Sequence, residues 1–206
     1  MLTLFTSPGS CAFATHLALA EAGADYAIRR VKMAENEQRS PEYLAINPLG
    51  RVPALVTPDG VLTETPALLI FVAQSYPTAK LAPMNDPVAL AKLQSFNSYL
   101  ATTVHVAHAH GRRAYRWTDD EAAMETMRAK VPQTMAEAFT LVEKALEGPW
   151  VMGEQFTVAD GYLYTLGRWL EIDKVDTAQF PKVMAHRARM NERPAVQRAL
   201  AEEKAA

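Results

Sequence analysis

The sequence predicts a small α/β domain with a four-stranded mixed sheet, followed by an all-helical bundle domain. Three observations lead to this fold class. Residues 2–31 alternate strand, helix and strand patterns with short joints, so their two strands are expected to be parallel. The pair Asp59-Gly60 separates two short apolar runs, which is the pattern of an antiparallel hairpin. From Val88 onward the apolar spacing is helical.

Composition places the chain among ordinary globular proteins of one or two domains. It has 206 residues, of which 49% are hydrophobic and 21% charged, enough for a sizeable core. The formal net charge of −2 argues against nucleic acid or an anionic membrane as a partner. A single cysteine excludes an internal disulfide framework, and no apolar run approaches a membrane span. We expect a cytoplasmic protein.

Capping residues mark where the helices of the first domain begin. Ser10 is expected to cap the first helix, which extends to Gly23, and Thr65 to cap a helix whose first residue is Pro66. Residues 32–39 are polar and expected to form a loop. The expected elements are strand 2–5, helix 11–22, strand 26–31, a short helix from Ser40-Pro41 to before Asn47, strands 54–56 and 61–63, and helix 66–76.

Prolines separate the two domains. Pro77, Pro83 and Pro87 punctuate a segment that fits neither pattern, so we expect a domain at 1–79, a linker at 80–87 and a helical domain at 88–206. One helix is expected from Val88 to about residue 115. A second runs from the cap at residues 118–121 towards residue 146, with a kink or break at Pro132. Residues 157–160 form an N-capping arrangement, to which we assign a folding role.

The segment from Asn47 to Val56 contains the turn-to-strand corner Val52-Pro53. Pro48 and Gly50 form a turn before it, and a cis peptide bond at Pro53 would leave the main-chain N–H and C=O of Val52 facing outward. These two groups can dock a peptide-like ligand. The alternative is an ordinary edge strand that begins with proline. Glu64 and Thr65 open the following helix, whose N-terminus can bind an anion.

This order of motifs resembles the glutathione site of the glutathione transferase family. The matching residues are Asn47-Pro48-x-Gly50-x-Val52-Pro53-x-Leu55 and then Leu62-Thr63-Glu64. The resemblance covers nearly the whole chain and is closest to the bacterial beta class. It implies a thioredoxin-like first domain, glutathione as cosubstrate, a homodimer, and a pocket between the domains for a small hydrophobic electrophile or a disulfide.

The resemblance also implies roles for individual residues in holding glutathione. Main-chain groups of Val52 would pair with its cysteinyl part, Glu64 with the γ-glutamyl ammonium, and Thr65 with the γ-glutamyl carboxylate. Where beta-class relatives often place a lysine for the glycyl carboxylate, this chain has Ala34-Glu35-Asn36-Glu37. Asn36 or Arg51 is the expected substitute.

Cys11 is the expected reactive group. It follows Ser10 at the start of the first helix, where unpaired N–H groups and the helix dipole can lower a thiol pKa. A lone cysteine is otherwise most often a packing residue. The run Ser7-Pro8-Gly9-Ser10-Cys11 resembles the beta class, whose cysteine lies at this turn. Position 14 is alanine, so the sequence has no Cys-x-x-Cys motif. Ser10 is the alternative catalytic residue.

A histidine cluster lies in the helical domain. His105 and His108 share a helix face, and metal binding, a solvated face and a role in the cleft are all open for them. His105 matches a histidine that beta-class members bring toward glutathione. The candidates for an anion-tolerant, aromatic rim of the substrate pocket are Arg112, Arg113, Arg116, Tyr115 and Trp117. The alternative for them is interhelical packing with exposed guanidinium groups.

Two functions from different classes follow. The first is a glutathione transferase that conjugates the glutathione thiolate to hydrophobic electrophiles or transfers thiols through Cys11, with peroxidase activity as a possible side reaction. The second is a related binding or regulatory protein without turnover. Glutathione is the only cosubstrate expected, and no metal is expected.

Overall fold

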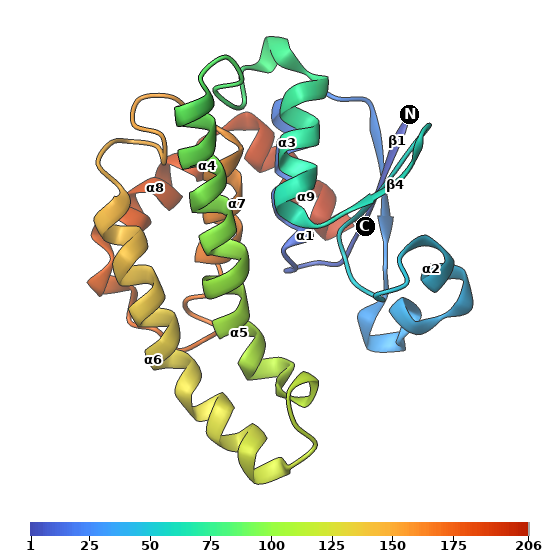
Figure 1. The fold of residues 1–206 in the computed structure, drawn as a ribbon, viewed down its shortest axis with the longest axis vertical. Helices are drawn as coiled ribbons and strands as arrows, with labels where there is room; N and C mark the ends of the chain where they lie inside the picture. The colour runs from blue at the N-terminus through green and yellow to red at the C-terminus, as the bar shows by residue number, and fades with distance from the viewer. Residues whose placement is uncertain (206) are drawn as a thin grey trace.

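The computed structural model describes residues 1–205, and its first half contains the expected sheet (Figure 1). The strands are β1 (Leu2–Thr6), β2 (Tyr26–Arg30), β3 (Ala54–Thr57) and β4 (Gly60–Thr63). They lie in the order β2-β1-β3-β4, with β1 parallel to β2 and the other neighbours antiparallel. The predicted mixed sheet is therefore confirmed.

Three helices belong to this half: α1 (Ala12–Glu21), α2 (Pro41–Ile46) and α3 (Thr65–Ser75). Helices α1 and α3 lie side by side between the sheet and the helical half, whereas α2 lies on the other side of the sheet (Figure 1). Nine of the ten residues of α1 are buried, because the helix packs against the sheet on one side and against α7 and α9 on others. Thr15 and His16 are buried with its apolar residues, because protein surrounds this helix.

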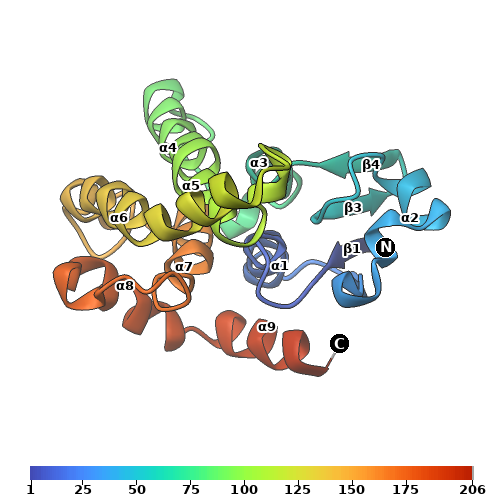
Figure 2. The ribbon, with the colours of Figure 1, turned by 90° about the horizontal axis from the view of Figure 1, so that it is seen from below.

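The second half is helical. Its helices are α4 (Pro87–Tyr99), α5 (His105–Arg112), α6 (Glu121–Ala145), α7 (Val158–Gly167), α8 (Pro181–Asn191) and α9 (Pro194–Ala205). Figure 2 shows α9 returning along α1, so the end of the described chain lies against the first domain. Just before α9, Arg193 Nη2 donates to Glu21 Oε2 of α1 at 2.7 Å. No helix among residues 1–205 has the length and apolarity needed to cross a membrane.

The helix expected from Val88 to about residue 115 is present as a continuous helical run over residues 87–112, but it is not one regular α-helix. A π-helical turn at Leu100–Val104 separates α4 from α5, and a short 3₁₀ turn at Ala114–Arg116 follows. One π turn keeps the helix axis nearly continuous, so the apolar spacing does not reveal it. Pro132 does not break α6. The carbonyl that loses its partner there belongs to exposed Arg128, which water can reach.

Both expected N-caps of the first domain were wrong. Ser10 Oγ donates to the carbonyl of Ser7 at 2.6 Å, and the helix begins two residues later, at Ala12. Thr65 is itself the first residue of α3, and Glu64 occupies the cap position with a φ of 68°. Ser10 instead closes a turn with Ser7, and a residue with positive φ, Glu64, precedes α3.

Candidate functional site

A cavity of about 760 Å³ lies between the two halves of the chain. The first domain contributes the loop before α1, the Val52-Pro53 corner and the start of α3. The helical domain contributes α5, the segment that follows it, and side chains from α7 and from the chain beyond its end. All the predicted site residues line this cavity, and their individual roles stay predictions.

The Val52-Pro53 corner is held by hydrogen bonds to the residue before it. The carbonyl of Arg51 accepts from Tyr43 Oη at 2.6 Å and from Asn47 Nδ2 at 2.7 Å. Gly50 has a φ of 60°, and a Cβ there would lie 2.7 Å from the carbonyl oxygen of Gln38. The turn therefore requires glycine for both conformation and space. The Val52-Pro53 peptide bond is cis, as expected.

Glu64 and Thr65 form the polar end of this wall. Glu64 combines a φ of 68° with a ψ of 114°, a conformation that non-glycine residues rarely adopt. No hydrogen bond or ion pair from residues 1–205 reaches its carboxylate within ordinary distances, although the carboxylate borders the cavity. Thr65 is buried beside it at the first turn of α3. The arrangement offers an acceptor and a helix N-terminus to a ligand.

Cys11 lies at the base of the cavity and is buried. Its thiol donates to the main-chain carbonyl of Val52, with Sγ and the oxygen 3.6 Å apart. Burial raises the pKa of the Cys11 thiol, while the Thr65 hydroxyl and the Arg113 charge act the other way. The expected depression of the pKa was therefore wrong, because the loss of water outweighs the position at the helix start.

The other wall presents His105 and Arg113. Arg113 Nη2 lies 3.3 Å from His105 Nε2, and burial together with the Arg113 charge lowers the pKa of His105 to about 3. His105 is therefore neutral near pH 7, and its Nε2 can accept a hydrogen bond from the guanidinium. Burial and the nearby Arg116 lower the pKa of Arg113 from its ordinary value. An arginine nevertheless stays protonated in a protein.

His108 does not lie on a solvated face. It is buried, its Nδ1 lies 2.7 Å from an Asp173 oxygen, and its ring stacks on Trp169 with centroids 4.0 Å apart. Trp169 in turn donates from Nε1 to the carbonyl of Gly9 at 2.9 Å. The helical domain therefore holds the loop that leads to Cys11. Asp173 is 65 residues from His108, so no local pattern reveals the pair.

The rim of the cavity contains the remaining predicted residues. Asn36 and Arg51 line it from the first domain, and Arg112 and Tyr115 line it from the segment around the end of α5. Arg39, which the sequence reasoning missed, lines it as well. Arg39 lies in the same polar stretch as Asn36, three residues further on, and this position could have identified it as a candidate for the rim. Among residues 1–205, no group of three or more His, Cys, Asp or Glu side chains could hold a metal ion.

Comparison with known proteins settles the family. The model for the glutathione S-transferase N-terminal domain matches residues 1–74, and that for the C-terminal domain matches residues 105–194. The chain belongs to the glutathione S-transferase family. Glutathione S-transferase GstA of Escherichia coli O157:H7 is 34% identical, with 98% of each chain covered. Membership supports the expected transferase function over a non-catalytic binding role.

Two solved structures are similar over 98% of each chain. A glutathione transferase homologue from Sulfitobacter, solved with bound glutathione, is 46% identical and has a TM-score of 0.95. A bacterial beta-class glutathione S-transferase of Sphingomonas chungbukensis is 31% identical with a TM-score of 0.85. The family, the thioredoxin-like fold of the first domain and the resemblance to the beta class are therefore confirmed.

Proposed function

We propose that the cavity binds glutathione and that the protein conjugates its thiolate to an electrophile. The observation that carries this proposal is the convergence of the Val52 main chain, the unpaired Glu64 carboxylate and Cys11 on one cavity. Glu64 would hold the γ-glutamyl ammonium and Thr65 its carboxylate, while the glycyl carboxylate lies near Asn36 or Arg51. A solved relative with bound glutathione supports the choice of cosubstrate.

The Cys11 thiol has a defined role in this proposal. Its present acceptor is the carbonyl of Val52, the same group that would accept from the cysteinyl N–H of glutathione. When glutathione takes this carbonyl, the S–H of Cys11 is free to donate to the glutathione thiolate. A raised pKa favours such donation, because the group stays a thiol near pH 7. His105 and Ser10 remain the further candidates for contact with the sulfur.

Thiol transfer through Cys11 is the second candidate activity. It would require Cys11 to attack a disulfide as a thiolate, and a buried thiol with a raised pKa does so slowly. Iodoacetamide alkylation followed against pH tests the difference. We expect a midpoint above the ordinary thiol value of about 8.5. A midpoint below this value, together with a glutathione adduct on Cys11, would instead favour transfer.

The test of conjugation uses glutathione and chlorodinitrobenzene with wild type, Cys11→Ala and Ser10→Ala. We expect Cys11→Ala to raise the pKa of bound glutathione and to lower the rate near pH 7, because a donor to the thiolate is lost. Ser10→Ala is expected to change the rate less, because Ser10 Oγ already donates to Ser7. The reverse order of effects would transfer the role to Ser10. Absence of any thioether would overturn the proposal.

We further propose that the protein is a cytoplasmic homodimer. Each chain would consist of a first domain at 1–79, a linker at 80–87 and a helical domain at 88–206. The structure describes the last domain as far as residue 205, and Ala206 lies outside the described residues. The gap between the end of α3 at Ser75 and the start of α4 at Pro87 supports the division. Light scattering on the purified protein tests the dimer.

A further inference from the structure

The cavity carries a surplus of positive charge. Five arginines line it, and among the described lining residues Glu64 is the one with a carboxylate side chain. The chain as a whole has a formal net charge of −2, so this positive surplus is local to the cavity. The arginines are Arg39, Arg51, Arg112, Arg113 and Arg116. Such a concentration of one charge in a cleft attracts ligands of the opposite charge.

Bound glutathione does not neutralise this surplus, if it lies as proposed above. It brings two carboxylates and one ammonium, and the ammonium faces Glu64. The γ-glutamyl carboxylate lies at the start of α3, and the glycyl carboxylate lies near Asn36 or Arg51 of the first domain. The three arginines after residue 111 belong to the other wall, which faces the second substrate. Their charges are left without an anion.

Arg113 is the best placed of the three to bind one. It is only partly exposed, whereas Arg112 and Arg116 are exposed, and charges exposed to water bind anions weakly. Its Nη2 faces a neutral acceptor, His105 Nε2, and its Nε is buried with no hydrogen-bond partner. Within residues 1–205 no carboxylate forms an ion pair with it. A buried donor without a partner is costly unless a ligand satisfies it.

We propose that the electrophile carries a carboxylate and that Arg113 binds it. The planar guanidinium, fixed by His105, presents parallel donors that match the two oxygens of a carboxylate. Arg113 and Cys11 line the same cavity, so a carboxylate on Arg113 would share that cavity with the glutathione sulfur. Arg113 is then a specificity-determining residue, and the favoured substrate is an anionic electrophile with an aromatic or otherwise apolar body.

An aryl halide serves as the probe for this proposal. In the reaction the glutathione thiolate attacks the ring carbon that bears chlorine, and a C–S bond forms. The C–Cl bond breaks, chloride leaves with the electron pair, and the proton of the glutathione thiol goes to solvent. No oxidant or reductant is needed. A carboxylate para to the chlorine forms and breaks no bond in this chemistry, and its electronic effect on the ring also acts in the uncatalysed reaction.

The experiment compares a chlorodinitrobenzoate with its carboxamide, which has the same ring without the charge. For each, kcat/KM is divided by the uncatalysed rate constant with glutathione, so intrinsic reactivity cancels. We expect wild type to favour the acid, and Arg113→Gln to lower the acid-to-amide ratio at least tenfold. Arg113→Lys, which keeps the charge without the planar fork, should fall between. The matched control is Arg30→Gln, at an exposed position at the end of β2.

The outcomes separate this inference from the proposed function on which it rests. If neither probe yields a thioether, the proposed function fails and this inference fails with it. If both react but wild type does not favour the acid, or Arg113→Gln leaves the ratio unchanged, only the inference fails. An equal fall for both probes would assign Arg113 to the glutathione thiolate and would also overturn it.

A second measurement covers the case in which Arg113→Gln does not fold. Dinitrobenzoate without the chlorine should inhibit wild-type turnover of the amide competitively, and dinitrobenzamide should inhibit it at least tenfold more weakly. Equal inhibition by the two compounds would contradict the proposal without any variant.

Discussion

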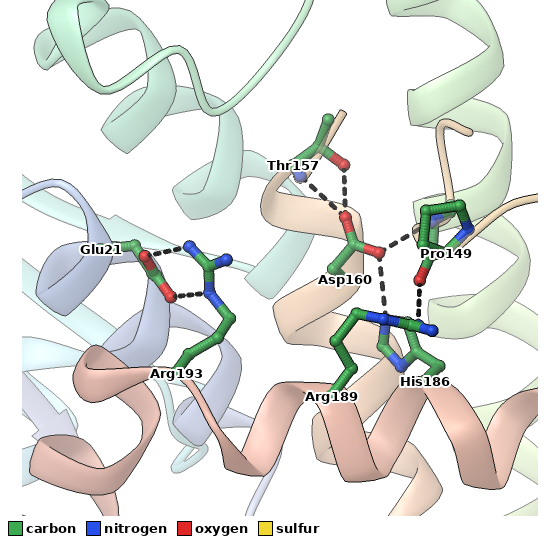
Figure 3. Close-up of polar contacts among 8 residues, drawn as sticks. Glu21, Pro149, Thr157, Asp160, His186, Arg189 and Arg193 are labelled. Carbon is green, nitrogen blue, oxygen red and sulfur yellow. Dashed lines mark hydrogen bonds and ion pairs between the residues drawn. The ribbon is translucent and has the colours of Figure 1, made fainter. Parts of the chain in front are cut away.

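Two carboxylates at helix N-termini behave in opposite ways in this molecule. Asp160, at the start of α7, is fully buried. Its Oδ2 accepts from Thr157 N–H and Oγ, and its Oδ1 lies 3.0 Å from His186 Nε2 (Figure 3). Oδ1 also accepts from Val151 N–H. Glu64, at the start of α3, is exposed to the cavity and has no partner among the described residues. The same chemical group therefore serves two purposes.

The difference lies in whether the fold itself satisfies the group. A buried carboxylate whose acceptor sites are filled by the protein holds segments together, and Asp160 joins the cap of α7 to residue 151 and to α8. A carboxylate left open beside a strained backbone contributes little to stability and is available to a ligand. Of these two carboxylates, the one that the fold leaves open is the one that borders the cavity.

The largest expected effect is the loss of stability on removing the Asp160 carboxylate. Asp160→Ala leaves His186 Nε2 and two N–H groups buried without their acceptor. Each buried donor left unsatisfied costs about 1–3 kcal/mol, so we expect a total loss of roughly 3–5 kcal/mol. Urea unfolding measures this loss of free energy. Glu64→Ala is the matched control, for which we expect a change below about 1 kcal/mol. Similar losses in the two variants would remove the distinction.

Glu64 should show the reverse pattern in ligand binding. Glu64→Gln removes the charge that faces the γ-glutamyl ammonium, and a hydrogen bond to a charged group is worth roughly 1.5–3 kcal/mol. We therefore expect the affinity for glutathione to fall about tenfold or more, as measured by calorimetry, with thermal stability nearly unchanged. The control is Glu42→Gln, an exposed position at the start of α2. Wild-type affinity in Glu64→Gln would exclude Glu64 from the site.

The two carboxylates also differ in what the sequence could predict. The cap at residues 157–160 is local, because both partners of the capping box lie within four residues, and its predicted capping geometry is confirmed. Its folding role stays a prediction. The additional bonds to Val151 and His186 depend on tertiary packing. Glu64 was assigned from a family resemblance rather than from its backbone conformation, which no residue preference announces.

The two walls of the cavity also differ in how far local sequence signals predict them. The first-domain wall follows from turns, a hairpin and a helix start, all of which are short-range signals. The other wall depends on Trp169 and Asp173, which reach His108 across the helical domain. The raised pKa of Cys11 is a further case, because burial is a property of the assembled fold. Local position alone therefore predicted the wrong direction.

His105 is a buried group whose effect on stability should depend on pH. Burial and the Arg113 charge hold its pKa at about 3 in the folded protein, against about 6.5 when unfolded. The unfolded chain therefore binds a proton between these values and the folded protein does not, so this contribution to stability is present above about pH 6.5 and is lost as pH falls. We expect wild type to lose on the order of 1–2 kcal/mol more than His105→Gln between pH 7 and pH 5.

Urea unfolding of both proteins at the two pH values measures this difference. Other groups titrate equally in wild type and variant, so the difference between the two losses isolates His105. An equal loss in both proteins would show that His105 already takes up a proton in the folded state, and that its hydrogen bond from Arg113 is not maintained.

The smallest expected effect concerns a group that the fold satisfies twice. The carbonyl of Arg51 accepts from Tyr43 Oη and from Asn47 Nδ2, just before the Val52-Pro53 corner. Tyr43→Phe removes one donor but leaves the carbonyl bonded to Asn47, so we expect the free energy of unfolding to fall by about 0.5–1.5 kcal/mol. Asn47→Ala should cost more, because Asn47 is buried and also accepts from the N–H of Leu49. Denaturant unfolding and glutathione titration of both variants measure this order, and a larger loss in Tyr43→Phe would mean that the tyrosine alone fixes the corner.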